Sequence, residues 1–209
     1  MSKNLFPVDY PKVLPIMEQF YTLQGEGKYA GHAAYFIRLA GCDVGCVWCD
    51  VKDSWVVALD QWMDVKEIVK KALDYPGRLV VITGGEPAMY DLTELTHLLK
   101  HHGFRIHIET CGAYPLTGEL DWITVSPKKF KAPLPEVINL AHELKVVVFH
   151  TSDFKWAEQN AQYINQDCKL YLQTEWNKKD KFNQMLIDYI KSNPAWSLSV
   201  QTHKYLDIP

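Results

Sequence analysis

Short apolar runs alternate with helix-like segments along most of this 209-residue chain, and this alternation restricts its fold more than any other feature. Strand-like runs occupy residues 16–21, 33–40, 79–82, 105–109, 122–125, 144–149, 169–173 and 198–201. Helical spacing or N-cap residues mark segments at 65–73, from Asp91 onward, at 154–165 and at 181–193, with Asp64, Asp91 and Asp180 as expected caps. Strands joined through helices by short connections predict an α/β protein with a mostly parallel sheet.

The length decides which parallel sheet is expected. A complete eight-unit β/α barrel typically takes about 250 residues, and this chain is shorter. We therefore expect a partial, incomplete β/α barrel that is open on one side, formed by a single domain over residues 1–209. Residues 1–15 contain three prolines and little periodicity, so we expect an irregular lead-in there.

Three of the five cysteines, Cys42, Cys46 and Cys49, fall on one loop with the spacing Cys-x3-Cys-x2-Cys. We expect thiolates on so short a loop to converge on one point, where they suit zinc, copper(I) or an iron–sulfur cluster. Structural zinc sites and cubane clusters normally take four protein ligands. Three ligands and an open position predict a metal centre that binds a further molecule, with a zinc knuckle or a chance cluster as the alternative. The loop follows the run at 33–40, at the strand end where α/β proteins place their active sites.

The cysteine spacing, with Trp48 just before the third cysteine, resembles the signature of the radical S-adenosylmethionine (SAM) superfamily. The resemblance implies a partial barrel of the radical SAM type and a 4Fe–4S cluster whose fourth iron binds SAM. Cleavage of SAM by an electron from the cluster would yield a radical that takes hydrogen from the substrate, with no catalytic side chain beyond the cluster and SAM. Residues 83–87, Thr-Gly-Gly-Glu-Pro, match the family's Gly-Gly-Glu-Pro motif. Their glycines are expected to expose backbone groups to SAM, and Glu86 to add an anionic acceptor.

Composition excludes several classes of protein. Hydrophobic residues make up 47% of the chain and charged residues 22%, as in soluble globular proteins. The net charge of −3 gives no sign of a nucleic-acid-binding surface. There is no apolar run of about 18 residues for a membrane helix, and the polar start is not a signal peptide. We expect a cytoplasmic protein, in which Cys111 and Cys168 are inert, partly buried thiols.

Two polar features outside the cysteine loop indicate ligand contacts. Residues 22–27 form a turn with two glycines, which either closes a hairpin or lets backbone approach a ligand, with Gln24 and Glu26 supplying polar contacts. Arg38 interrupts the apolar run at 33–40. A charge there needs a partner, either an internal acid or an anionic ligand at the end of the strand.

Within the superfamily the chain resembles the 7-carboxy-7-deazaguanine synthases over nearly its whole length. The resemblance rests on the 23–27 turn, Arg38, both motifs, residues 109–112 and 126–128, and an Ile-Pro terminus. It implies a homodimer that converts 6-carboxy-5,6,7,8-tetrahydropterin to 7-carboxy-7-deazaguanine with loss of ammonia by radical ring contraction, in queuosine biosynthesis. SAM would be re-formed after each turnover, and an external donor such as flavodoxin or ferredoxin would supply the electron.

The resemblance, together with the residue chemistry, assigns roles residue by residue. Substrate contacts are expected at Leu23, Gln24, Gly25, Glu26, Arg38, Thr83, His203 and Pro209. SAM contacts are expected at Gly85, Glu86, Ser126, Pro127, Lys128, Gln173, Thr174, Glu175 and Trp176. Glu109 either accepts a hydrogen bond from SAM or orients a neighbouring loop, and Lys129 and Lys131 are expected to form a solvated basic patch.

The chain departs from the family pattern after the third cysteine. The family often has Asp-Thr there, and the threonine hydroxyl helps to bind a magnesium ion that bridges to substrate. Here the pair is Asp50-Val51, and a valine side chain cannot coordinate a cation that requires oxygen ligands. Magnesium dependence is therefore in doubt, with Asp50, Asp53 and Ser54 as possible replacements.

The last seven residues bear on the substrate site. Tyr205, Leu206 and Ile208 give this tail enough apolar surface to dock onto the body. Pro209 has a fixed φ, and its terminal carboxylate is expected to accept from the amino-pyrimidine edge of a pterin. Two other functions fit parts of the sequence: an activase that makes a glycyl radical on a partner protein, and an electron-carrying iron–sulfur protein, which the missing fourth cysteine opposes.

Overall fold

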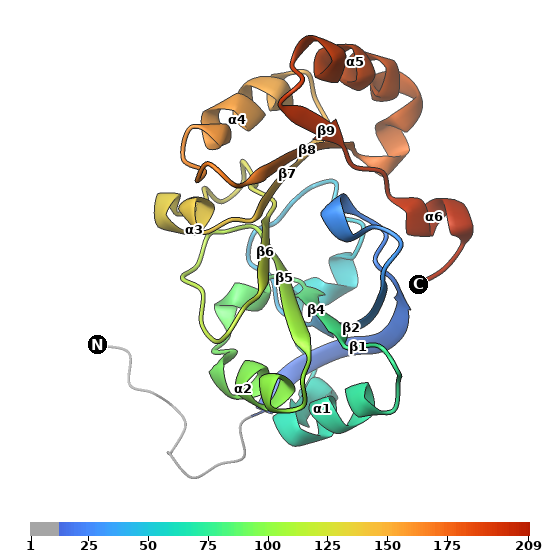
Figure 1. Cartoon of the computed structure of the whole chain (residues 1–209), viewed down its shortest axis with the longest axis vertical. Coiled ribbons are helices and arrows are strands. Elements are labelled where there is room, and N and C mark those ends of the chain that lie inside the picture. The colour runs from blue at the N-terminus through green and yellow to red at the C-terminus, as the bar shows by residue number, and fades with distance from the viewer. Residues whose placement is uncertain (1–12) are drawn as a thin grey trace.

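The computed structural model describes residues 13–209, in which nine strands form one curved sheet. Their order is β3-β1-β2-β4-β5-β6-β7-β8-β9. β1 pairs antiparallel with β2 and β3, and all other neighbours are parallel. The edge strands β3 and β9 do not pair with each other, so the predicted incomplete, mostly parallel barrel is confirmed (Figure 1). The strands are β1 (Val13–Leu23), β2 (Ala33–Leu39), β3 (Trp62–Asp64), β4 (Leu79–Gly84), β5 (Arg105–Thr110), β6 (Trp122–Val125), β7 (Glu143–Val148), β8 (Lys169–Thr174) and β9 (Trp196–Leu198).

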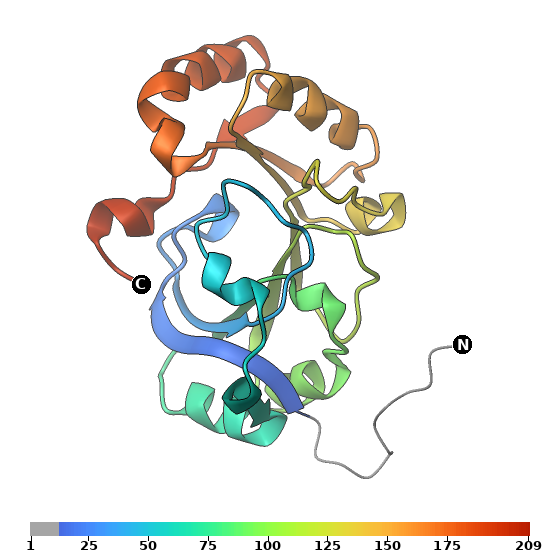
Figure 2. The ribbon, with the colours of Figure 1, turned by 180° about the vertical axis from the view of Figure 1, so that it is seen from behind.

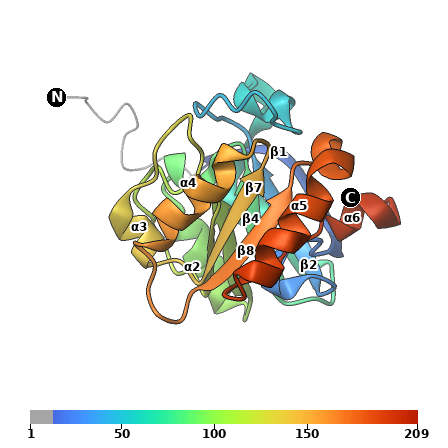
Figure 3. The same ribbon diagram turned by 90° about the horizontal axis from the view of Figure 1, so that it is seen from above.

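Five helices cover the outer face of the curved sheet, and a sixth lies apart from them (Figures 1 and 3). The outer helices are α1 (Val65–Leu73), α2 (Thr93–His101), α3 (Pro135–Asn139), α4 (Ser152–Ala161) and α5 (Lys179–Ser192). The sixth, α6 (Thr202–Leu206), contacts the loop between β1 and β2, where the Thr202 amide donates to the Gly25 carbonyl at 2.9 Å. Short 3-10 helices occupy Gly27–Tyr29, Lys52–Trp55, Leu59–Gln61, Pro87–Met89 and Trp176–Lys178.

The strands separate an apolar face from a polar one because successive side chains point to opposite sides of a sheet. On β5, Ile106 and Ile108 are fully buried in the main core together with Leu95 and Leu99 of α2. Glu109, which follows Ile108 and points to the opposite face, lines a cavity inside the curved sheet. The helices therefore stabilise the convex face, and polar side chains collect on the concave one.

Several predicted boundaries differ from the structure. β1 extends the expected strand at both ends, so residues 13–15 are not irregular; Pro15 fits because β3 pairs there and its carbonyl accepts from Ala40 at 2.8 Å. Residues 1–12 of the expected lead-in lie outside the described part of the chain. α5 starts at Lys179, and Asp180 lies in its first turn, so the expected cap there is wrong. The α4 helix covers Ser152–Ala161 instead of 154–165, because Asp153 already accepts from two backbone amides, those of Phe149 and His150.

The other two caps agree better with the sequence. The Asp64 carboxylate accepts from the Lys66 amide at 2.7 Å, as expected of an N-cap. Asp91 accepts from the Thr93 amide at 3.0 Å, one residue before the position at which α2 is capped. Among residues 13–209, no helix combines the length and the apolar character that crossing a membrane requires.

Candidate functional site

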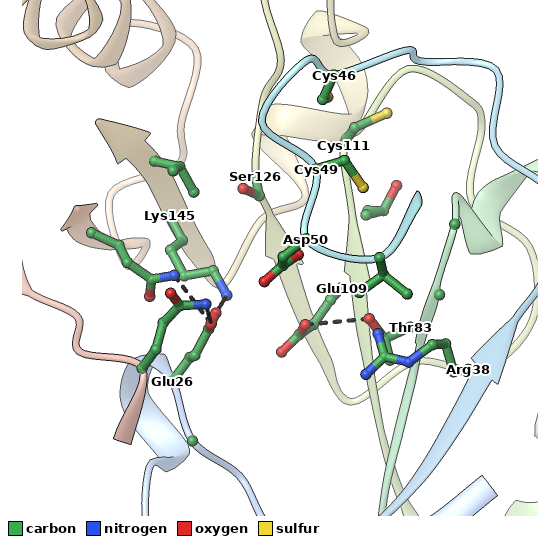
Figure 4. A pocket seen from close by; sticks show the side chains of 18 of the residues that line it. Glu26, Arg38, Cys46, Cys49, Asp50, Thr83, Glu109, Cys111, Ser126 and Lys145 are labelled. Carbon is green, nitrogen blue, oxygen red and sulfur yellow. Dashed lines mark hydrogen bonds and ion pairs between the residues drawn. The ribbon is translucent and has the colours of Figure 1, made fainter. Parts of the chain in front are cut away.

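The concave side of the sheet encloses a cavity of about 490 Å³, the size range of small-molecule sites. The loop that follows β2 crosses this side in the view from behind (Figure 2). Cys46, Cys49 and Cys111 lie at one end of the cavity, and Glu26, Lys145, Arg38 and Thr83 lie toward the other (Figure 4). A centre held by the cysteines therefore shares one space with the polar residues expected to bind substrate.

Most of the expected site residues line this one cavity. They are Leu23, Gln24, Gly25, Glu26, Arg38, Cys42, Cys46, Cys49, Thr83, Gly85, Glu86, Ser126, Lys128, Gln173, Glu175, Trp176, His203 and Pro209. Pro127 and Thr174 do not line it. Thr174 instead lines a smaller hollow beside α5 and β9, and its buried hydroxyl has no hydrogen-bond partner among the described residues.

The three loop cysteines are free thiols, and Cys46 packs with Val44 and Cys111 in a small apolar group. Burial raises the pKa of Cys42, and it raises that of Cys46 to about 11. Such thiols become thiolates when a metal supplies the opposing positive charge. Within residues 13–209, no three His, Cys, Asp or Glu side chains surround a common point closely enough to hold one metal ion. A cluster does not need that arrangement, because it takes only one thiolate for each of three separate irons, so Cys42, Cys46 and Cys49 stay its predicted ligands.

Two lysines expected to form a solvated basic patch, Lys129 and Lys131, each form an ion pair with an acidic side chain. Lys131 forms an ion pair of 2.6 Å with Asp43 of the cysteine loop, and the Tyr114 hydroxyl also donates to Asp43. Lys129 pairs with Asp153 at 2.5 Å. Neither lysine lines the cavity, and the side chains of Lys129 and Lys131 are 39% and 34% exposed, so both lie at the surface as expected, each with a carboxylate beside its ammonium. The Lys131 pair fixes the cysteine loop to the strand-end segment after β6.

A buried charge pair joins the β1–β2 loop to the centre of the sheet. The Lys145 ammonium on β7 donates to the Glu26 carboxylate, and their side chains are only 6% and 14% exposed. Gln173 and Gln201 donate to the other Glu26 oxygen at 3.1 and 2.8 Å. Burial alone would raise the pKa of Glu26, but the charge and hydrogen bond of Lys145, the Gln201 hydrogen bond and the charge of His203 lower it to about 2. Glu26 is therefore a carboxylate at neutral pH, with its oxygens occupied by protein donors.

Lys145 and Gln201 were not predicted as site residues, yet both line the cavity. Lys145 is a charge inside the apolar run at 144–149, the same signal that drew attention to Arg38. A search of every predicted strand for a charged residue inside an apolar run would have identified Lys145. Gln201 carries no comparable local signal, because its partner Glu26 lies 175 residues away in the sequence.

Glu109 orients the β1–β2 loop, one of the two roles considered for it. The Gln24 amide donates to one Glu109 oxygen at 3.0 Å, and the Thr83 hydroxyl donates to the other at 3.4 Å. Gln24 also accepts from the Glu26 amide at 3.0 Å. This chain of contacts fixes the expected substrate residues Gln24 and Thr83 on the cavity wall.

The glycines of the 22–27 turn bring protein side chains close to the backbone. A Cβ at Gly25 would lie 2.2 Å from His203 Nδ1, and one at Gly27, whose φ is +63°, would lie 2.1 Å from a Glu143 oxygen. The turn closes the β1–β2 hairpin, one of its two expected roles, and it also lines the cavity; contact of its backbone with a ligand stays a prediction. Its glycines are needed for contact with the tail and with β7.

Arg38 has the internal acid that its position demands. Its Nε donates to Glu18 at 2.6 Å, and its guanidinium lies over the Phe20 ring at 5.8 Å. Among residues 13–209, its two terminal nitrogens have no hydrogen-bond partner. Phe20 and Phe36 stack beside it at 5.2 Å and line the same cavity. The wall thus offers two free NH2 groups of Arg38 next to a flat aromatic surface.

The Gly-Gly-Glu segment is occupied largely by contacts within the protein. The Gly85 amide donates to Leu39 and the Glu86 amide to Gly41, both at 2.9 Å. The Glu86 carboxylate is 1% exposed and accepts from the amides of Ala88 and Cys111 and from the Thr110 hydroxyl. The motif therefore anchors the cysteine loop against β4, and its glycines permit the close approach of the two chains.

A buried carboxylate oxygen on the cavity wall lacks a partner. Glu175 is 7% exposed; its Oε1 accepts from Asn177, whereas its Oε2 has no hydrogen-bond partner among the described residues. Ser126, which directly follows β6, lines the same cavity, and its hydroxyl accepts from Lys128 at 2.5 Å; Lys128 lies over the Trp48 ring at 5.3 Å. An unpaired buried oxygen has a high free-energy cost, which a cationic ligand group would remove.

The chain end reaches the cavity through α6. The amide and hydroxyl of Thr202 both donate to Gly25, and the Ile208 amide donates to His203 at 3.2 Å. His203 and Pro209 line the cavity. Lys204, which was not predicted, donates to Asp50 of the cysteine loop at 2.7 Å.

Comparisons with known proteins agree with one another. The model of the radical SAM superfamily matches residues 36–151. Two relatives named 7-carboxy-7-deazaguanine synthase, from Flavobacterium psychrophilum and a Synechocystis species, are each 50% identical and cover 97% and 98% of the chain, and each match spans 96% of the relative. The crystal structure of QueE from Escherichia coli is similar with a TM-score of 0.82 and 33% identity, covering 91% of this chain and 95% of that one.

Proposed function

The chain belongs to the radical SAM superfamily and, within it, to the family of 7-carboxy-7-deazaguanine synthases, and on that premise we propose that it converts 6-carboxy-5,6,7,8-tetrahydropterin to 7-carboxy-7-deazaguanine with loss of ammonia. One observation carries the substrate assignment. The cysteine loop, an arginine with two free NH2 groups and the chain terminus line the same small cavity.

The residues present fit the cofactors of the superfamily. Cys42, Cys46 and Cys49 would hold a 4Fe–4S cluster, because each offers one soft thiolate ligand toward the cavity. The unpaired Glu175 oxygen would accept from the SAM ammonium, beside Gln173, Trp176 and Lys128. When bound, the cluster and SAM supply a radical that removes hydrogen from substrate. The chain's own residues hold both reactants and exclude water.

The opposite wall suits a flat, anionic substrate. Arg38 can give a carboxylate two parallel, charge-assisted hydrogen bonds from its terminal nitrogens. Phe20 and Phe36 offer an aromatic surface beside it for a planar ring. Gln24 and Thr83, fixed by Glu109, present polar groups at the ring edge.

The glycyl-radical activase is not favoured. An activase must admit a loop of a partner protein, whereas this cavity is small and ringed by side chains from both ends of the chain. An electron carrier has no need of a polar cavity at its cluster. We propose further that the enzyme is a homodimer, acts as one domain on a small molecule, and receives its electron from a flavodoxin or ferredoxin. We also propose that it is cytoplasmic, because free thiols assemble clusters under reducing conditions.

The reaction is tested directly on the reconstituted protein. Anaerobic protein loaded with iron and sulfide, SAM and a reductant is expected to convert the carboxypterin to a product with the mass of 7-carboxy-7-deazaguanine. SAM concentration should stay nearly constant, because it is re-formed. Cleavage of SAM without pterin conversion, but with radical formation on a glycyl-radical enzyme, would replace this proposal with the activase.

A one-residue extension tests the role of the chain end. Adding alanine after Pro209 replaces the terminal carboxylate with an amide and moves the charge by about 3.5 Å. If that carboxylate accepts from the amino-pyrimidine edge, KM for the pterin should rise about tenfold or more, the loss of one charge-assisted pair. The cluster content and the slow cleavage of SAM without substrate should stay unchanged. An extended protein with the kinetics of the original would show that Pro209 has no such role.

A further inference from the structure

We infer that the ammonium group of Lys204 supplies the fixed positive charge beside Asp50 in this chain, in place of a magnesium ion, so that turnover does not require magnesium. This role depends on the proposed function, since it concerns how the pterin carboxylate is held. Lys204 and Asp50 come from opposite ends of the chain and meet on the cavity wall at 2.7 Å.

The side chains at positions 51, 53 and 54, the expected replacements beside Asp50, offer no oxygen ligand to the cavity. Val51 lines the cavity without any side-chain oxygen. Ser54 is 1% exposed, and its hydroxyl donates to the Val51 carbonyl at 2.6 Å, so it faces away from the cavity. Asp53 does not line the cavity.

The lysine that takes this place is held by its surroundings. Its ammonium lies over the Trp176 ring at 5.5 Å, and the side chain is 21% exposed. The helix that carries it is tied to Gly25 by two hydrogen bonds and to Trp176 by an edge-to-face contact of Tyr205 at 5.0 Å. A charge held in place by the fold loses little conformational entropy when a ligand arrives.

The ammonium and a divalent ion compete for the same carboxylate. Asp50 is 56% exposed and has Lys204 as its ion-pair partner. A magnesium ion on Asp50 would have to displace that ammonium and would find no second oxygen at position 51. Lys204 and Arg38 line one cavity, so a carboxylate bound there faces two permanent cations.

The first experiment compares turnover with and without the metal. Reconstituted wild-type enzyme, assayed anaerobically with SAM and the carboxypterin, should lose less than about twofold in rate when EDTA removes magnesium, as expected of a transition state without a metal contact. Manganese(II), a hard cation detected by its electron-spin signal, should show no bound fraction in the presence of SAM and pterin. A loss of more than about tenfold with EDTA, or one manganese bound per chain, would overturn the inference.

The second experiment changes the two residues. Lys204→Met should raise KM for the pterin by about tenfold to a hundredfold, the loss of a charge-assisted hydrogen bond, and Lys204→Arg should keep most of the affinity. The double variant Val51→Thr/Lys204→Met restores an oxygen ligand and frees Asp50. It should bind manganese, and its turnover should rise when magnesium is added. A double variant that folds and carries its cluster but binds no manganese would contradict the competition between the two cations.

Lys179→Met is the matched control. Lys179 lies over the same Trp176 ring at 3.8 Å but does not line the cavity or contact Asp50. Its KM should equal that of the wild type; an equal rise would assign the Lys204 effect to Trp176 and overturn the inference. No product in either metal condition, with SAM still cleaved, would reject the proposed function itself.

Discussion

Replacing Cys42, Cys46 or Cys49 with alanine is expected to abolish the iron–sulfur cluster and, with it, SAM cleavage and product formation. In the proposed site each cysteine would be the only protein ligand of one of three irons, and a cluster in which two irons lack a protein ligand is lost readily. Wild-type protein reconstituted anaerobically should hold about four irons and four sulfides. Iron analysis, visible absorbance and the electron-spin signal of the reduced protein would measure the loss.

Cys111→Ser is the demanding control for this prediction. Cys111 lines the cavity and packs in the same apolar group as Cys46, so position alone does not distinguish it from the ligands. Its pKa is raised by burial and by the neighbouring Glu86 carboxylate, which disfavours the thiolate that iron requires. Cys168 directly precedes β8 and does not line the cavity, so Cys168→Ser should also keep the cluster. Loss of iron from the Cys111 variant would mean a fourth protein ligand and no open iron for SAM.

The sequence predicts the features of the site that lie at strand ends. The cysteine loop after β2 and the Gly-Gly-Glu segment after β4 follow adjacent parallel strands, so their meeting at one edge of the sheet follows from topology. Arg38 was recognisable because a charge in an apolar strand needs a partner. The partners of the Gly85 and Glu86 amides were not recognisable. Whether those amides face a ligand or a neighbouring loop depends on how closely the chain after β2 approaches the chain after β4.

Contacts between the two ends of the chain could not be predicted from local sequence patterns. Lys204 and Asp50 are 154 residues apart, and neither interrupts an apolar pattern. β3, α3 and α6 have three to five residues each, too few for a period of 2 or 3.6 to stand out. The role of the 22–27 glycines likewise required the positions of His203 and Glu143, which come from other elements.

Lys145→Met is expected to destabilise the protein by about 3–5 kcal/mol at neutral pH, the usual result of removing one partner from a buried ion pair. Lys145 is the buried cation among three acids: it donates to Glu26, and its pKa is raised by the charges of Glu109, Glu26 and Glu143. Methionine fills a similar volume but leaves Glu26 buried without its cation. Urea unfolding followed by circular dichroism, in oxygen-free buffer, would give the free energy of unfolding.

Two variants separate this charge effect from a loss of packing. Lys145→Met/Glu26→Gln removes both charges and keeps an amide within reach of Gln173 and Gln201, so it should recover part of the loss. Lys70→Met removes an exposed lysine whose pair with Glu67 spans 3.9 Å. That surface pair should contribute less than about 1 kcal/mol.

The loss should also depend on pH, with a sign that follows from Glu26. In the wild type the pKa of Glu26 is lowered from 4.5 to about 2, so its contribution to stability is complete above pH 4.5 and disappears as the pH falls toward 2. Without Lys145, burial raises the pKa of Glu26 above its unfolded value. The variant therefore loses stability as the pH rises from the unfolded pKa through the raised folded pKa. The free-energy gap between the two proteins should therefore widen from pH 5 to pH 8. A constant gap would mean that methionine costs packing alone, and a gap below about 1 kcal/mol would mean that solvent already screens this pair.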